Sequence, residues 1–162
     1  MTIMAKSLVA YFSATGTTGV AATKLASAIN ADVYEIIPKV PYTNADLDWR
    51  DEQSRSKIEM KDESSRPPIG SDKIENIGEY EVIFLGAPLW WYRLPTILNT
   101  FLESYDMTGK KIVLFGTSGG SRLGDSAEHL KVSAPGATII SGDVLNGIRS
   151  DEELRVFAEK YI

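Results

Sequence analysis

Cysteine is absent from this chain of 162 residues, and so is any long hydrophobic run. The missing thiols exclude disulfide bonds and a cysteine nucleophile, and they agree with a reducing, cytoplasmic location. The first apolar stretch ends at Ser13, which is too short for a signal peptide or a membrane span. Basic residues are also in deficit, because 17 Lys and Arg face 22 Asp and Glu, which gives a net charge of -5. This balance argues against nucleic acids and anionic membranes as partners.

Short apolar segments alternate with helical patterns along the chain. Continuous apolar residues predict five buried strands, at residues 7–12, 33–37, 80–85, 111–115 and 137–140. Helical spacing predicts helices over residues 20–29 and 94–102, and capping-box patterns at Asp125 and Ser150 open two more. Such alternation indicates a parallel sheet with helices on both faces. We therefore expect a single α/β domain over residues 1–162, doubly wound with strand order 2-1-3-4-5.

A polar connection at residues 38–78 interrupts this alternation. It separates the second and third strands, and its most charged part is expected to include helical turns. A connection of this length in a compact domain is usually functional or mobile. Tyr42 and Trp49 could either contact a ligand or anchor the connection. Arg55 could meet an anion or pair with Glu59 at helical spacing.

The loop after the first strand combines hydroxyl groups with a helix N-terminus. It consists of Ser13, Ala14, Thr15, Gly16, Thr17 and Thr18. Free backbone N–H groups and the helix dipole favour a phosphate group at such a turn. A helix cap needs only one hydroxyl residue, whereas this loop has four and neither Lys nor Arg. We predict that it binds phosphate through dipoles and not through countercharge.

The loop after the third strand carries three consecutive aromatic residues. It consists of Pro88, Leu89, Trp90, Trp91 and Tyr92. Adjacent side chains diverge, so the three rings cannot all enter one core. Such rings suit stacking on a flat heteroaromatic ligand, although either tryptophan alone could equally pack in the core. We predict that Trp90 or Trp91 contacts the ligand.

The loop after the fourth strand contains Thr117, Ser118, Gly119 and Gly120. Its glycines let the backbone approach a ligand and present N–H groups to carbonyl oxygens. Residues 116–120 also match G-x-S-x-G, the nucleophile elbow of serine hydrolases, so Ser118 is a remote alternative nucleophile. His129, the only histidine, would be its base, with Asp125 on the same helix face. We expect His129 to be a solvated helix residue instead.

Other ligand classes lack their motifs. No cluster of His and Cys suggests a metal site. No G-x-G-x-x-G follows the first strand and no G-x-x-x-x-G-K-[ST] occurs, so dinucleotide and P-loop sites are unsupported. A phospho-receiver domain would need an acidic residue at the end of the third strand, where this chain has Ala87 and Pro88.

Taken together, six stretches resemble the flavodoxin family, specifically its short flavodoxin-like branch. They are residues 12–18, 41–43, 46–49, 54–55, 86–91 and 115–121. The resemblance implies one bound flavin mononucleotide (FMN), with the first loop on its phosphate and the other two loops around the isoalloxazine. It implies a redox protein that carries electrons between partner proteins. The alternative is an FMN-dependent NAD(P)H oxidoreductase that reduces quinones, flavins or other small acceptors by two electrons.

Two departures from the family pattern bear on that choice. The third loop has no aromatic residue, where many flavodoxins place a tyrosine over one flavin face. Residues 89–93 contain no glycine, and Tyr92 stands where similar sequences often carry one. In flavodoxins this loop typically flips a peptide so that a carbonyl accepts from N5–H of the reduced flavin, which stabilises the one-electron state and normally needs a glycine. A bulky residue in the left-handed region costs about 1–2 kcal/mol, which would disfavour that state. Both departures favour two-electron chemistry, whereas the extent of the resemblance favours the carrier role. We also expect the segment 41–59 to lie near the flavin edge.

Overall fold

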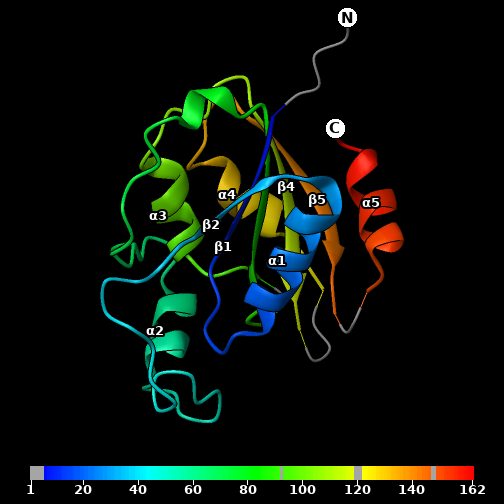
Figure 1. Cartoon of the computed structure of the whole chain (residues 1–162). Coiled ribbons are helices and arrows are strands. Elements are labelled where there is room, and N and C mark those ends of the chain that lie inside the picture. Colours follow the sequence, from blue (N-terminus) through cyan, green and yellow to red (C-terminus); the bar gives the residue numbers. More distant parts are fainter. Residues whose placement is uncertain (1–5, 92, 119–121, 147–148) are drawn as a thin grey trace, which may run out of the picture.

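The computed structural model describes residues 6–91, 93–118, 122–146 and 149–162 (Figure 1). The predictions for Tyr92, Gly119 and Gly120 therefore lie outside the described residues. Five parallel strands form one sheet in the order β2-β1-β3-β4-β5. The predicted doubly wound α/β fold with strand order 2-1-3-4-5 is confirmed.

Each of the five strands lies where an apolar run predicted it. They are β1 (Ser7–Tyr11), β2 (Asp32–Glu35), β3 (Val82–Pro88), β4 (Lys111–Thr117) and β5 (Thr138–Val144). The strand β5 continues four residues beyond the predicted end because it is an edge strand, where polar residues can face solvent. A register irregularity opposite Leu114 and Phe115 accommodates this polar half.

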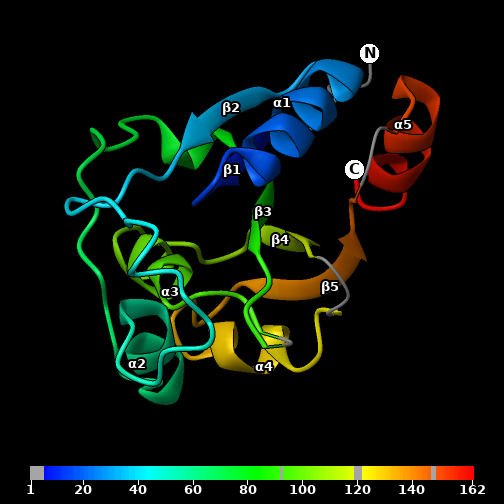
Figure 2. The same cartoon turned by 90° about the horizontal axis from the view of Figure 1, so that it is seen from below.

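Two pairs of helices cover the two faces of the sheet, and a further helix lies in the connection between β2 and β3. They are α1 (Thr17–Ile29), α2 (Arg55–Lys61), α3 (Ile97–Glu103), α4 (Ser126–Lys131) and α5 (Asp151–Glu159), with a 3₁₀ turn η1 (Ile77–Glu79). Helices α1 and α5 lie on one face and α3 and α4 on the other (Figure 2). No helix within the described ranges is long and apolar enough to cross a membrane.

Only one of the two predicted capping boxes forms its side-chain bond. The Ser150 hydroxyl accepts the N–H of Glu153 at 3.1 Å, so α5 begins as predicted. Asp125 precedes α4 but makes no side-chain capping bond. Its carboxylate lies 3.6 Å from Nε2 of His129 instead, one turn further along α4.

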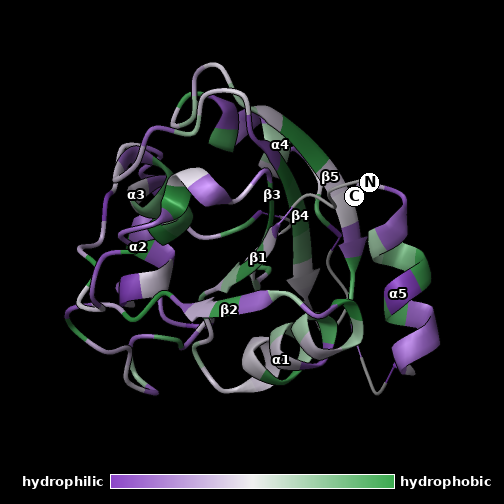
Figure 3. Cartoon of the chain, turned by 45° about the horizontal axis from the view of Figure 1, so that its top comes forward, coloured by the Kyte–Doolittle hydropathy of each residue, from purple (hydrophilic) through white to green (hydrophobic). Residues whose placement is uncertain are grey.

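Two apolar clusters, one on each face, hold the sheet and helices together. Leu25, Phe84 and Phe157 belong to the cluster beneath α1 and α5. Ile97, Phe101 and Leu130 belong to the larger cluster beneath α3 and α4. Figure 3 shows hydrophobic residues along the central strands and polar residues on α2 and on part of α5. Because the strands are parallel, the loops that leave their carboxyl ends share one edge of the sheet.

The connection between β2 and β3 lies at that edge. Figure 2 looks onto the carboxyl ends of the strands and shows α2 beside α3 and α4. The predicted helical turns are confirmed as α2. An isolated bridge between Pro38 and Ile69 closes the connection on itself.

Candidate functional site

The first loop is shaped by its own serine. The hydroxyl of Ser13 accepts the N–H groups of Gly16 at 3.0 Å and Gly19 at 3.1 Å. Gly16, the N-cap of α1, has φ 95°, a left-handed conformation that favours glycine. Nothing lies within 4 Å of a Cβ built there, so backbone conformation and not crowding selects glycine. The loop therefore curves back on Ser13 and leaves its outer side open.

Several donors of this loop have no internal partner. Among the described residues, no acceptor contacts the backbone N–H groups of Thr15, Thr17 or Thr18. Thr15, Gly16 and Thr17 are exposed, whereas Ala14 is half-buried. Peptide N–H groups at the start of a helix, with neighbouring hydroxyls and no cation, form a donor set that fits a phosphate group.

The first and third loops are joined by a buried hydrogen bond. The hydroxyls of Thr18 and Thr117 lie 2.7 Å apart, and both residues are buried. The N–H of Ser118 donates to Oδ1 of Asn146 at 2.8 Å, and the Asn146 amide donates back to the Ser118 carbonyl. The Ser118 N–H is thus engaged within the protein. Asn146 was not predicted from the sequence, and its only signal is its place after the fifth strand, at the same edge.

The second loop sends its two tryptophans to different places. Pro88 is half-buried, and Leu89 is buried with its N–H on the carbonyl of Thr117 at 2.9 Å. The half-buried Trp90 packs in an aromatic cluster, edge-on to Phe12 at 6.0 Å and to Tyr42 at 5.6 Å between ring centroids. Trp91 is 39% exposed. The expectation that these adjacent rings do not share one core is confirmed.

Trp91 has a strained backbone. Its φ is 52°, in the left-handed region, although it is a bulky residue. Two hydrogen bonds between Trp90 and Arg93, of 2.9 and 3.2 Å, close the turn that contains it. Such a conformation costs about 1–2 kcal/mol for a residue with a side chain. The sequence has no glycine here, yet the turn uses the conformation that glycine would supply.

The segment 41–59 is tied to this cluster by a network around Tyr42. The Tyr42 hydroxyl donates to Glu59, and Nε of Arg55 donates to the same carboxylate at 2.9 Å. The Arg55 guanidinium also lies 3.8 Å from the centre of the Tyr42 ring. Burial first, and then the bond to Glu59, raise the pKa of Tyr42 above its usual range. Arg55 thus pairs with Glu59, and Tyr42 anchors the segment against Trp90.

Trp49 differs from Tyr42. It is 65% exposed, so it does not anchor the segment to the body of the protein. It lies in a loop with Asp48 and Arg50, which pair with each other at 3.2 Å.

His129 is less exposed than the sequence suggested. Its side chain is 19% exposed, and Nε2 lies 2.9 Å from Nη1 of Arg93, so the expectation of a solvated helix residue is wrong. The reason is that Arg93 follows the turn after β3 and reaches across to α4. Nε2 also lies 3.6 Å from both Asp125 and Glu63. Asp125 and His129 do share a helix face, as predicted, but the imidazole faces Arg93.

In the described part of the chain, no group of three or more His, Cys, Asp or Glu side chains could hold a metal ion.

Comparisons with known proteins agree with this fold. The family profile described as Flavodoxin matches residues 6–161. A search of curated proteins found no match. A candidate flavoprotein from Bacteroides eggerthii is 48% identical with a TM-score of 0.89, over 97% of this chain and 98% of that one. A second, from Bacteroides uniformis, is 45% identical with a TM-score of 0.87, over 96% and 98%.

A more distant structure shares the architecture. The flavoprotein of Lactobacillus acidophilus, solved in complex with FMN, has a TM-score of 0.66 at 24% identity, over 96% of this chain and 99% of that one. At this identity the likeness concerns the fold. The family profile, by contrast, spans nearly the whole sequence and agrees with the strand order of the sheet. The chain belongs to the flavodoxin family.

Proposed function

We propose that this protein binds one FMN at the three loops and carries electrons as a flavodoxin-type redox protein. The observation that carries the proposal is the set of unpartnered N–H groups in the first loop, at the N-terminus of α1. A phosphate monoester there would be stabilised by peptide dipoles. Family membership and the FMN complex of the Lactobacillus acidophilus protein agree with this ligand.

The chain's own residues supply the rest of the site. Trp90 offers a flat apolar surface at the same edge of the sheet, and Phe12 and Tyr42 hold its ring in place. The bond between Thr18 and Thr117 fixes the first loop relative to the third. Asn146 holds the Ser118 peptide by a hydrogen bond. This bond limits the orientations that the third loop's backbone can take beside the isoalloxazine ring. When bound, FMN supplies the redox chemistry, and these residues position it and shield it from water.

Titration of the flavin-free protein tests the proposal. We expect FMN to bind at one per chain and to lose its fluorescence as Trp90 stacks on it. Riboflavin, which lacks the phosphate, serves as the matched ligand and should bind far more weakly. Exchange of Thr15 and Thr17 together for leucine should weaken FMN binding much more than it lowers unfolding stability. A wild-type protein that gains no flavin spectrum with added FMN contradicts the proposal.

A second candidate function is two-electron reduction of a small acceptor. The observation that favours it is the turn around Trp91, where a bulky residue holds a left-handed conformation between two hydrogen bonds. A peptide rearrangement in such a turn must move an indole ring and disturb those bonds. The one-electron reduced flavin, which such a rearrangement would stabilise, would then be less favoured than in a protein with glycine at position 91.

A further inference from the structure

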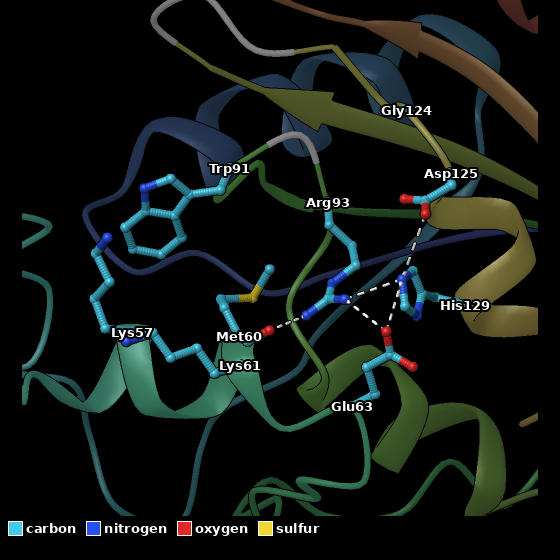
Figure 4. Close-up of a pocket in the computed structure, with 9 residues that line it drawn as sticks. All are labelled: Lys57, Met60, Lys61, Glu63, Trp91, Arg93, Gly124, Asp125 and His129. Carbon is cyan, nitrogen blue, oxygen red and sulfur yellow. Dashed lines mark hydrogen bonds and ion pairs between the residues drawn. The ribbon is translucent and has the colours of Figure 1, made fainter. Parts of the chain in front are cut away.

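A pocket of about 420 Å³ lies beside the three-loop site. Helix α2, the turn after β3 and the start of α4 form its walls (Figure 4). Trp91 belongs to the pocket, whereas its neighbour Trp90 packs toward Phe12 and Tyr42. The volume is within the range of small-molecule sites. Adjacent residues therefore contact the two regions, Trp91 the pocket and Trp90 the aromatic cluster.

The wall beside α2 is aromatic and basic. The ammonium group of Lys57 lies 4.6 Å from the centre of the Trp91 ring, and Lys61 lines the pocket one helical turn later. A cation over an exposed ring gains less energy than the left-handed backbone of Trp91 costs. The contact with Lys57 alone therefore does not account for the strain, and strained residues concentrate at functional sites.

On the opposite wall, the positive charge of Arg93 is balanced by neighbouring groups of the protein. Arg93 donates to Nε2 of His129 at 2.9 Å and to the carbonyl of Met60, and it pairs with Glu63 at 3.4 Å (Figure 4). Because a guanidinium can only donate, Nε2 of His129 is the acceptor of this hydrogen bond. Asp125 lies on the same side of the pocket. The excess positive charge is therefore on the α2 side.

One exposed carboxylate outside the pocket now pairs with that charge. Glu52 lies 2.6 Å from Lys61 and 3.4 Å from Lys57, and its side chain is 62% exposed. The Lys61 side chain is exposed to the same degree, and ion pairs at exposed positions are weak, so another anion can replace Glu52 on Lys61 at little cost. A carboxylate or sulfonate on a ligand in the pocket would compete with Glu52 for these two ammonium groups.

We propose that this pocket binds a small planar organic anion, with its ring on Trp91 and its carboxylate or sulfonate on Lys57 and Lys61. The chain as a whole is acidic, with a net charge of -5, so general electrostatic attraction does not supply such binding. The ligand would lie next to the site proposed for FMN. Its role as a redox reactant rests on that proposed function, whereas the binding itself does not.

Isothermal titration of the full-length protein with naphthalene-2-sulfonate tests the proposal, with and without added FMN. The neutral 2-naphthalenemethanol is the matched ligand, and we expect it to bind about tenfold more weakly. Lys57→Gln and Lys61→Gln should each weaken sulfonate binding several-fold. Glu52→Gln removes the competing carboxylate and should strengthen it. Lys160→Gln, an equal charge change beyond α5, should leave it unchanged.

The results that overturn the proposal are distinct from those that overturn FMN binding. Equal affinity for the sulfonate and the alcohol, or equal losses from Lys57→Gln and Lys160→Gln, would exclude a specific anion site. Absence of sulfonate binding at millimolar concentration, in a folded protein with or without FMN, would exclude it as well. Sulfonate binding in a protein that takes up no FMN would retain the pocket and refute the proposed function.

Discussion

The buried hydroxyl pair of Thr18 and Thr117 ties two loops of the site together. Thr18→Val keeps the side-chain shape but leaves the Thr117 hydroxyl buried without its partner. We expect a loss of about 1–3 kcal/mol in the free energy of unfolding. Urea unfolding of the flavin-free protein measures it. The double exchange Thr18→Val with Thr117→Val should cost less than the sum of the two single exchanges, and strict additivity would contradict the coupling.

We expect the free energy of unfolding to depend on alkaline pH through Tyr80. Its hydroxyl donates to Asp32 at 2.6 Å. Burial first, and then Asp32, raise the pKa of Tyr80 to about 12 from the model-peptide value of 10.0. The folded state thus keeps a proton that the unfolded chain loses, so this stabilisation is complete below pH 10 and declines as pH rises toward 12.

Tyr80→Phe is the matched variant for that dependence. It lacks the titrating hydroxyl, so its unfolding midpoint should fall less than that of the wild type between pH 9 and 11. Thermal or urea unfolding at a series of pH values measures the difference. Parallel curves for the two proteins would show that Tyr80 does not contribute.

Individual residues also mark the limit of what the sequence could tell. The hydroxyl-rich first loop could be predicted from the sequence because its donors and the helix that follows it are adjacent in the chain. Asn146 and Arg93 were not, because each acts on a partner distant in sequence, Ser118 and His129 respectively. The exposure of His129 was misjudged for the same reason: a helix pattern does not reveal what reaches across from another loop.

Among the elements, the segment 41–59 is linked to the candidate site by Tyr42. Tyr42→Phe keeps the ring against Trp90 and removes the hydrogen bond to Glu59. We expect a loss of about 1 kcal/mol and faster hydrogen exchange in this segment. Added FMN should slow exchange there in the wild type, since Tyr42 supports Trp90. Unchanged exchange on FMN addition would indicate a passive connection, and Trp49→Ala, at an exposed position, serves as the neutral control.

Elements with continuous apolar runs were the most predictable. The strands β1, β3 and β4 are buried on both faces, so their central residues are apolar. The second half of β5 is polar because it lies at an edge, and this half was missed. Helix α2 was expected only as helical turns, since its charged sequence gives no clear apolar face.

For the molecule as a whole, the proposed redox function leads to a prediction on one-electron and two-electron reduction of bound FMN. Anaerobic photoreduction of the FMN-loaded protein measures how much one-electron reduced flavin accumulates at half reduction. We expect little in the wild type, because the turn around Trp91 resists rearrangement. Trp91→Gly removes the indole ring that a rearrangement must move, and glycine adopts positive and negative φ about equally, so this variant should increase the amount. Abundant one-electron reduced flavin in the wild type would identify an ordinary one-electron carrier.

The global fold followed from the alternation of elements, whereas the relation between sites did not. Five strands with helices between them allow few arrangements, and the observed order is one of the common doubly wound orders. The pocket beside Trp91 needs α2, the turn after β3 and α4 together. Sequence periodicity carries no information on such a meeting of three segments.

The internal bonds of the first loop also have a kinetic consequence. Ser13 already holds the N–H groups of Gly16 and Gly19, and Thr18 is already tied to Thr117 before any ligand arrives. Association with FMN then needs no slow rearrangement of this loop. In stopped-flow experiments the observed rate should rise linearly with FMN concentration, without a plateau, at about 10⁵–10⁷ M⁻¹s⁻¹. Ser13→Ala should introduce a plateau, because the loop must then order itself around the phosphate at each encounter.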